Sequence, residues 1–444
     1  MEFRPNSGQV IFQLPYSDRL RDKLQFYSLF ESNPSVINFS FSATVLDLPS
    51  PRVVSVIDIT SEFLTPKQTS QLTHELCLLD PEIAGGSFYY CQGDTEDFIE
   101  LRLKKMLKVP QADALNHSLG SPVIVEDYSI LVFEGLFFSE STKSARAVQG
   151  QEVCVISSYF GILSRELFRN CVTKAVVSSA FQDSIALLDM RYLPGACGGA
   201  VYTSDFSAIV GLTLPSALEY FTPMVSMEHF YETDQREDFP VLKSIVMIRT
   251  GFSTGTGVVI SPSHILTAAH VVQGKGSTVV IEHQSESYKG TVERVGECID
   301  LALVSVAPHK LIPIEKNSEP SQGDSVFAVG FALSRELAGS KPVITRGSLN
   351  KVIEYKGQPT LLLSSALVLN GHSGGALIDS QHRLLGIISS NAKLSKKRIF
   401  PTCNLSIAFT ASQRPDLWSD KSLELQELQG YETVRSLPRY RPKL

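Results

Sequence analysis

Two stretches of the sequence occur twice, and this internal repeat constrains the fold more than any other feature. Gly150–Leu167 resembles Gly323–Leu337, and both stretches end in Ser-Arg-Glu-Leu. Farther along the chain, Pro194–Val201 resembles Asn370–Leu377, and both contain Gly-Gly-Ala. Two matches in the same order predict two copies of one domain, joined in tandem.

The length of 444 residues leaves room for two such domains. A charged stretch at residues 232–238 lies between the copies and has the composition of a solvated linker. We therefore expect domains at residues 1–235 and 241–415, followed by a C-terminal tail at 416–444.

Most of the chain has the pattern of β-structure. Short runs rich in Val, Ile, Phe and Tyr recur between Gly, Pro, Ser and Asp residues. Many short strands at close spacing indicate sandwiches or barrels, so we expect an all-β protein. Examples are Val53–Ile59, Ile130–Phe133, Val153–Ser157, Val258–Ile260, Thr278–Ile281, Ala302–Val306, Ser325–Val329 and Leu361–Ser365. Helical patterns occur near residues 66–80 and 422–429, and we attach no function to them.

The composition excludes several functional classes. Apolar residues make up 43% of the chain and the net charge is −6, which indicates a globular protein without a broad basic face for nucleic acid. No apolar run reaches the roughly 20 residues of a membrane helix, and the N-terminus lacks the pattern of a secretory signal. The seven cysteines contain no C-x-x-C pair, which indicates a reducing, intracellular compartment rather than a disulfide framework or a zinc site. We expect no metal and no cofactor.

The second copy contains three elements that fit nucleophilic catalysis. Thr-Ala-Ala-His ends at His270, Asp-Leu-Ala-Leu begins at Asp300, and Gly-His-Ser-Gly-Gly contains Ser373. A serine hydroxyl needs a base that takes its proton during attack, and that base needs an acidic group to hold its tautomer. We predict that Ser373 is the nucleophile, His270 the general base and Asp300 its orienting acid. The glycines permit the backbone N–H groups of Gly371 and Ser373 to point at one developing oxyanion.

These elements, in the order His, Asp, Ser, resemble the chymotrypsin-type serine proteases. Within that superfamily, Gly386–Asn391 after the nucleophile resembles the Deg/HtrA group. The layout, with Ser157–Gly161 in the first copy and Ser389–Asn391 in the second, resembles the family of peroxisomal leader-peptide-processing proteases. The resemblance implies two tandem chymotrypsin-like double β-barrel domains, of which the first is degenerate and the second active.

The same resemblance implies a serine endopeptidase of the peroxisomal matrix that removes leader peptides from imported enzymes, including those of β-oxidation, and cleaves itself. Pro442, Lys443 and Leu444 keep the Lys-Leu of the Ser-Lys-Leu peroxisomal signal, so we expect the import receptor to bind them. Matrix proteins are the expected substrates, and a homo-oligomer is left open. Two alternatives stay in view: a Deg-type quality-control protease of another compartment, and a catalytically silent binding scaffold.

The first copy lacks a complete set of catalytic groups. Alignment on the repeat gives Cys197 at the position of the nucleophile and Asp127 at the acidic position, but Asp58 at the position of the histidine. A cysteine without an imidazole partner has little thiolate at neutral pH. We expect this domain to be structural or regulatory, with Cys197 as a small buried apolar side chain.

The substrate pocket is predicted from its place in the sequence. In the chymotrypsin fold the base of the S1 pocket lies about six residues before the nucleophile, which here is Leu367. No acidic residue occurs at 357–378 or 386–392, so we expect a small to medium, uncharged P1 side chain. His264, His372 and His382 are interpreted as bystanders.

Overall fold

The structure is a computed structural model of the whole chain, and it divides into two units, residues 1–239 and 240–444, which are described separately. The described residues are 7–15, 36–47, 51–57, 87–92, 98–108, 129–134, 143–160, 165–180, 185–216, 220–227, 239–251, 253–283, 286–296, 299–307, 311–317, 319–332, 341–395 and 398–418. Outside them lie several predicted features: Asp58, Asp127, the helical stretches at 66–80 and 422–429, the linker at 232–238, and the C-terminal Pro442, Lys443 and Leu444. The predicted domain limits stay a prediction.

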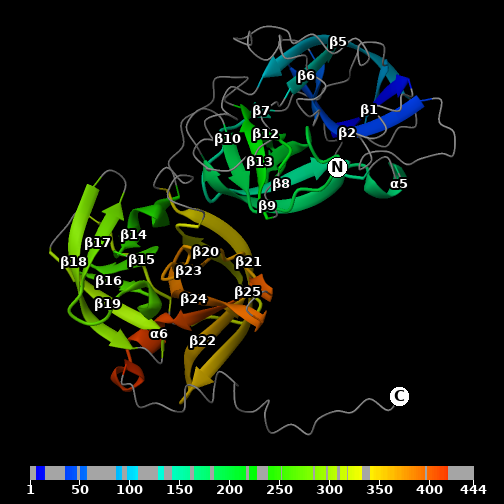
Figure 1. The fold of residues 1–444 in the computed structure, drawn as a ribbon. Helices are drawn as coiled ribbons and strands as arrows, with labels where there is room; N and C mark the ends of the chain where they lie inside the picture. Colours follow the sequence, from blue (N-terminus) through cyan, green and yellow to red (C-terminus); the bar gives the residue numbers. More distant parts are fainter. Residues whose placement is uncertain are drawn as a thin grey trace, which may run out of the picture. The chain divides into compact units, whose positions relative to one another are not determined.

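Six antiparallel strands form the first closed barrel of the second unit, in the order β14-β15-β16-β19-β18-β17 (Figure 1). The strands are β14 (Ile245–Arg249), β15 (Thr254–Ser261), β16 (His264–Thr267), β17 (Thr278–His283), β18 (Glu286–Gly296) and β19 (Leu301–Val306). Two short 3-10 helices accompany this barrel, η3 (Pro240–Ser244) and η4 (Ala269–Val271).

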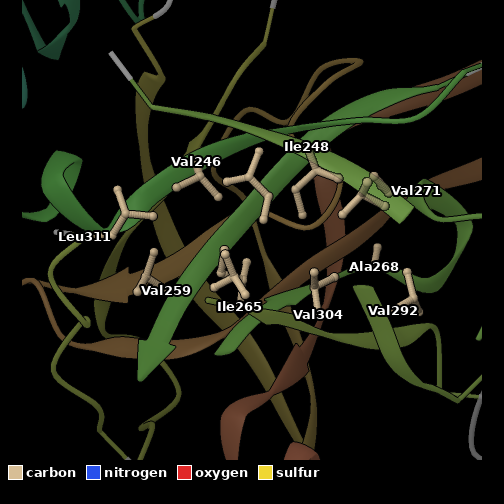
Figure 2. Close-up of a cluster of buried hydrophobic side chains, with 12 residues drawn as sticks. Val246, Ile248, Val259, Ile265, Ala268, Val271, Val292, Val304 and Leu311 are labelled. Atoms are coloured by element: carbon tan, nitrogen blue, oxygen red, sulfur yellow. The ribbon is translucent and has the colours of Figure 1, made fainter. Parts of the chain in front are cut away.

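The core of this barrel follows the two-residue period of a strand. Val246 and Ile248 on β14 point inward together with Val304 on β19 (Figure 2). Val306, two residues further along β19, belongs to the same buried cluster. Along β18 the burial alternates over most of the strand, because one face is packed and the other carries Lys and Glu side chains in solvent. The barrel therefore holds a continuous apolar centre.

A second closed barrel in the same unit has the order β20-β21-β22-β25-β24-β23. Its strands are β20 (Ser325–Gly330), β21 (Val343–Tyr355), β22 (Gln358–Ser364), β23 (Ala376–Asp379), β24 (Leu384–Ser395) and β25 (Arg398–Ala408). The chain continues into α6 (Phe409–Ser412) and η5 (Pro415–Trp418), whose Leu417 and Trp418 are buried.

The first unit repeats this architecture. Strands β1 (Ser7–Pro15), β2 (Val36–Asp47), β3 (Pro51–Ile57), β4 (Ser87–Gln92), β5 (Ile99–Lys108) and β6 (Ser129–Glu134) form a closed barrel. A second ring consists of β8 (Glu152–Ser157), β9 (Cys171–Ala180), β10 (Ile185–Leu188), β11 (Ala200–Thr203), β12 (Ala208–Thr213) and β13 (Thr222–Ser226), with β11 paired to β12 and β7 (Lys143–Ser144) added to β12 in parallel. Helix α5 (Arg165–Phe168) follows β8.

All four rings share one strand order: first, second, third, sixth, fifth, fourth. The predicted fold class is therefore confirmed, since the chain is all-β with two tandem double-barrel units of chymotrypsin-like topology. Each of the eight predicted strands overlaps an observed one. Among the described residues, the structure contains no helix with the length and hydropathy to cross a membrane.

The sequence repeat is also present in the backbone. Gly150 and Gly323 adopt positive φ values of 84° and 97°, each two residues before the first residue of β8 or β20. The N–H of Gly150 donates to the carbonyl of Val177, and that of Gly323 to the carbonyl of Leu349, both at 2.8 Å. The two copies thus use the same turn to enter their second barrel.

An equivalent pair of bonds fixes the register of the third strand in each unit. Oγ of Ser55 donates to the carbonyl of Ser42 at 2.7 Å, and Oγ1 of Thr267 donates to the carbonyl of Thr256 at 2.7 Å. In the sequence, Asp58 follows Ser55 by three residues, as His270 follows Thr267 by three residues. Asp58 therefore has the sequence position that corresponds to His270. This register agrees with the alignment made from the sequence.

Candidate active site

The three predicted catalytic residues come from both barrels of the second unit. His270 lies on η4, directly after β16, and Asp300 directly precedes β19. Ser373 lies in the turn between β22 and β23 of the other barrel, and its side chain is partly exposed. Backbone bonds connect the two barrels here, because the N–H of Thr256 on β15 donates to the carbonyl of Ser373 at 2.8 Å.

His270 and Asp300 form a close pair. Nδ1 of His270 lies 3.0 Å from each carboxylate oxygen of Asp300. An ionised carboxylate only accepts hydrogen bonds, so Nδ1 carries the proton and Nε2 presents a lone pair. This is the tautomer that a general base requires. The His270 side chain is 50% exposed, which leaves it accessible to a substrate.

The backbone around Asp300 supports the same arrangement. Its φ of 55° is in the left-handed region, which Asp tolerates better than most residues. The carbonyl of Asp300 accepts from the N–H of Ala269, and Oδ1 accepts from the N–H of His270, both at 3.1 Å. Asp300 therefore holds η4 by its backbone and the imidazole by its side chain.

A fourth side chain completes this group. Oγ of Ser389 on β24 donates to Oδ2 of Asp300 at 2.5 Å. The sequence resemblance includes Ser389 but predicts no role for it. Its partner is 89 positions away in the chain, so only the packing of β24 against the first barrel brings the two together.

The turn that contains Ser373 depends on two glycines. Gly371 and Gly374 have φ values of 98° and 82°. A Cβ at Gly371 would lie 2.0 Å from the carbonyl oxygen of Phe331, and one at Gly374 would lie 2.1 Å from that of Thr256. Only glycine fits both the backbone angle and the space at these positions.

Hydrogen bonds fix the carbonyl groups of this turn. Oγ1 of Thr256 donates to the carbonyl of Gly371 at 2.7 Å, and the N–H of Gly375 donates to the carbonyl of His372 at 2.8 Å. Within the described part of the chain, the N–H groups of Gly371 and Ser373 donate to no acceptor. These are the two groups predicted to bind the oxyanion, and they are available for a ligand.

The segment that contains Leu367 is held by side chains. Leu367 is 6% exposed, and its carbonyl accepts from Oγ1 of Thr345 at 2.6 Å. The carbonyl before it accepts from Nδ2 of Asn404 at 2.6 Å, and the carbonyl after it accepts from Nδ2 of Asn391 at 2.7 Å. Three consecutive carbonyls are thus anchored, which gives this segment one position next to β24 and β25.

The first unit retains the turn, with Cys197 at the position that corresponds to Ser373. Gly195 and Gly198 have φ values of 85° and 80°, close to those of the second unit. Cys197 between them is fully buried. The N–H of Gly198 donates to the carbonyl of Thr213, as Gly374 does to Ile388, both at 2.8 Å.

This register aligns Leu214, the residue after Thr213, with Ser389, the residue after Ile388. Leu214 is fully buried and has no polar side-chain atom that could hold a carboxylate.

The other histidines of the second unit lie in different surroundings. Nε2 of His264 lies 3.3 Å from the carboxylate of Glu293 on β18, which is separated from β16 by β19. Burial lowers the pKa of His382 and, more strongly, that of His372, to about 4. Among the described residues, no three His, Cys, Asp or Glu side chains gather as they would around a metal ion.

Comparison with known proteins finds a family match within the second unit. Residues 255–387 match the trypsin-like peptidase domain family. That span contains His270, Asp300 and Ser373. The second unit therefore contains a trypsin-like peptidase domain, and the curated relatives of the chain are serine proteases.

The particular relatives are more specific. The chain is 26% identical to a human peroxisomal leader peptide-processing protease over 312 residues, which is 60% of this chain and 55% of that protein. The mouse protein of the same name is 25% identical over 318 residues, with the same coverage. The serine endoprotease DegS of Haemophilus influenzae is 24% identical over 213 residues, 47% of this chain and 59% of that protein. The chain thus spans about half the length of the curated relatives it matches, and the predicted resemblance is confirmed.

Solved structures are similar to part of the chain. The active form of a protease from M. tuberculosis is 24% identical, with a TM-score of 0.34, over 39% of this chain and 79% of that one. A serine endoprotease from Yersinia pestis is 22% identical, with a TM-score of 0.33, over 39% of this chain and 61% of that one. The strand pairings themselves, rather than these overlaps, define the fold.

Proposed function

We propose that the chain is a serine endopeptidase whose second unit hydrolyses peptide bonds. Ser373 is the nucleophile, His270 the general base and then acid, and Asp300 the group that orients it. The observation that carries this proposal is the position of Nδ1 of His270, 3.0 Å from both oxygens of Asp300, with Ser389 bonded to the same carboxylate.

Acylation follows from these positions. Oγ of Ser373 attacks the scissile carbonyl carbon while Nε2 of His270 takes its proton. The carbonyl oxygen gains negative charge, which the N–H groups of Gly371 and Ser373 stabilise. Nε2 then gives the proton to the leaving amine, the C–N bond breaks, and an acyl-enzyme remains.

Deacylation repeats these steps with water. His270 takes a proton from water, the resulting hydroxide attacks the ester carbonyl, and the proton returns to Oγ of Ser373 as the acid product leaves. Asp300 stays ionised throughout and stabilises the imidazolium that forms in each half-reaction.

Active-site labelling tests this proposal. A fluorophosphonate probe reacts with an activated serine and is expected to label the full-length chain at Ser373. The Ser373→Ala variant is expected to lose the label and to keep only the residual catalysis, on the order of 10³–10⁴ over water. Ser365→Ala, a nearby serine outside the turn, serves as the control. An unlabelled wild-type chain that is fully folded would favour the silent scaffold instead.

The cellular role is proposed as the processing of proteins imported into peroxisomes, and of the enzyme itself. Support comes from the similarity to the human and mouse peroxisomal leader peptide-processing proteases and from the C-terminal Pro442-Lys443-Leu444. Deletion of Lys443 and Leu444 from a tagged chain is expected to abolish import. N-terminal proteomics of peroxisomes with wild type and Ser373→Ala then identifies the substrates. Retained import after the deletion would favour a Deg-type quality-control protease of another compartment.

The first unit is proposed to be catalytically silent and structural or regulatory. Its fully buried Cys197 and the apolar Leu214 support this role. Leu367 is proposed as the floor of an uncharged S1 pocket, which agrees with its burial between anchored carbonyls.

A further inference from the structure

His372 lies directly before the nucleophile, and its side chain is fully buried. Two hydrogen bonds join it to Leu369. The N–H of His372 donates to the carbonyl of Leu369 at 3.1 Å, and the N–H of Leu369 donates to Nδ1 of the His372 ring at 3.2 Å. The residues at the two ends of a four-residue turn are therefore held together by a backbone bond and by a side-chain bond.

The direction of the second bond defines the state of the ring. Since Nδ1 accepts, the neutral ring carries its proton on Nε2. Nε2 is buried, and no acceptor for it lies among the described residues. Burial lowers the pKa of His372 to about 4, so the ring stays neutral and Nδ1 stays an acceptor near neutral pH.

The ring also has little space in which to move. A Cβ on Gly330, at the end of β20, would lie 2.9 Å from Cα and 3.1 Å from Cδ2 of His372. The carbonyl of His372 accepts from the N–H of Gly375 at 2.8 Å. The His372 side chain is thus packed against β20 while its main chain belongs to the turn that carries Gly371 and Ser373.

The first unit provides an internal comparison. The backbone bond is present there, since the N–H of Ala196 donates to the carbonyl of Leu193 at 2.9 Å. Ala196 has no side-chain acceptor, so the second bond of the turn cannot form. The side-chain bond therefore belongs to the unit with the complete catalytic set and is missing from the unit without it.

We propose that His372 is a positioning residue for the oxyanion hole. Nδ1 of His372 accepts a hydrogen bond from the N–H of Leu369 and so closes the turn. The closed turn keeps the N–H groups of Gly371 and Ser373 directed at one oxyanion. This role rests on the proposed protease function and goes beyond it, because His372 itself touches neither the substrate nor the reacting atoms.

The test compares three substitutions of this one side chain in the full-length protein. His372→Asn keeps an acceptor at the same number of bonds from Cα, because Oδ1 of Asn replaces Nδ1 of His. His372→Leu keeps similar volume but has no acceptor. His372→Gln is polar but places its acceptor one carbon farther out.

Two readouts are used: the fluorophosphonate labelling rate of Ser373, and kcat and KM on a quenched fluorogenic peptide with alanine at P1. Removal of one oxyanion donor lowers kcat by roughly 10²–10³, and its displacement is expected to lower kcat and the labelling rate by about 10- to 100-fold in His372→Leu. KM is expected to change by less than about threefold, since the interaction strengthens only in the transition state. His372→Asn is expected to stay within about fivefold of wild type, and His372→Gln to resemble His372→Leu.

The outcomes separate the two proposals. An unlabelled wild-type chain contradicts the protease function, whatever the variants do. A labelled wild type with His372→Leu folded and equally reactive overturns the positioning role, and so do equal losses in His372→Asn and His372→Leu. If His372→Leu does not fold, His372→Gln decides, and full activity of that variant overturns the role.

Discussion

Ser389 and Asp300, which belong to different barrels, are joined by a hydrogen bond of 2.5 Å from Oγ to Oδ2. Oδ1 of the same carboxylate accepts from the main-chain N–H of His270, and both oxygens face Nδ1 of its ring. The carboxylate is therefore fixed from both barrels. Any relative movement of the two barrels of this unit would change the direction in which the imidazole points.

Ser389→Ala is expected to lower kcat by about 10- to 100-fold. A hydrogen bond to a charged group contributes roughly 1.5–3 kcal/mol, and each 1.4 kcal/mol lost from transition-state stabilisation is tenfold in rate. The measurement is steady-state hydrolysis of a fluorogenic peptide. Ser390→Ala, the exposed next residue on β24, is the matched control and is expected to retain wild-type kcat. Equal activities of the two variants would contradict the role of Ser389.

Asp300→Asn is expected to lower kcat by roughly 10⁴. The asparagine tolerates the left-handed backbone at this position, where φ is 55°, so the fold is retained. Its amide N–H₂ faces Nδ1 of His270 and favours the tautomer with the proton on Nε2, which cannot act as a base. Circular dichroism checks that the fold is retained, and peptide hydrolysis by the same preparation measures the loss of kcat. A folded variant with activity within tenfold of wild type would show that Asp300 is not the orienting group.

The sequence predicts the catalytic set and the tandem fold because both depend on short, continuous patterns. Ser-Arg-Glu-Leu and Gly-Gly-Ala occur once in each unit, so the repeat is visible without a structure. Strands such as β19, with five apolar residues in six, are equally plain. The long strands β18 and β21 were not predicted, because their outward faces carry Lys, Arg and Glu and only part of each strand is buried.

The roles proposed for Ser389 and His372 could not be derived from the sequence for a different reason. Each depends on one hydrogen bond whose existence is decided by tertiary packing or by turn geometry. From the sequence, His372 is interpreted as a bystander, since the backbone beside Ser373 is expected to point its ring away. Its complete burial and its bond to Leu369 become apparent only when the turn is closed.

Acid is expected to destabilise the second unit through His372. Its pKa is about 4 in the folded chain, against an ordinary 6.5, so between these values the unfolded chain binds more protons than the folded one. The free energy of unfolding therefore falls as pH decreases through this window, by about 1.4 kcal/mol per pH unit and by about 3 kcal/mol in total. Urea denaturation at pH 7, 6, 5 and 4.5 measures this slope.

The control for this prediction is His372→Asn, which cannot take up the proton. Burial also lowers the pKa of His382, and that of Asp379 is lowered by hydrogen bonds from Arg383 and Asn317 that exceed its desolvation. Both groups titrate in the wild type and in the variant, so their contributions cancel when the two are subtracted. Identical pH slopes for the two proteins would contradict a buried neutral His372.

Cys197→Ala is expected to leave peptide hydrolysis unchanged. The thiol is fully buried in the first unit. In that unit Leu214 occupies the position that corresponds to Ser389. Loss of one buried sulfur atom is expected to lower stability by about 1 kcal/mol, which a shift in the urea midpoint detects. The comparison is with Ser373→Ala on the same substrates. Cleavage that disappears with Cys197→Ala but survives Ser373→Ala would make the first unit a second, cysteine-dependent site.

Leu367→Asp tests the proposed S1 pocket. Leu367 is 6% exposed and its carbonyl is bonded to Thr345, so a carboxylate placed there would be desolvated in a rigid segment. A P1 Lys or Arg can pair with that carboxylate, while a P1 Ala cannot. The ratio of kcat/KM for P1 Lys over P1 Ala is therefore expected to rise about tenfold or more, although total activity falls because the pocket was not shaped for an ion pair.

Leu367→Asn separates the effect of charge from that of shape. Asparagine has nearly the same size as aspartate but no charge, so it is expected to lower activity without raising the preference for P1 Lys. The measurement is kcat/KM over a peptide series that differs only at P1, with wild type and both variants side by side. A wild type that already prefers Lys or Arg would show that the missing acidic residue near Ser373 does not define the pocket. Equal P1 profiles in two folded variants and wild type would place the pocket away from Leu367, because a buried charge at its floor must change which side chains enter it.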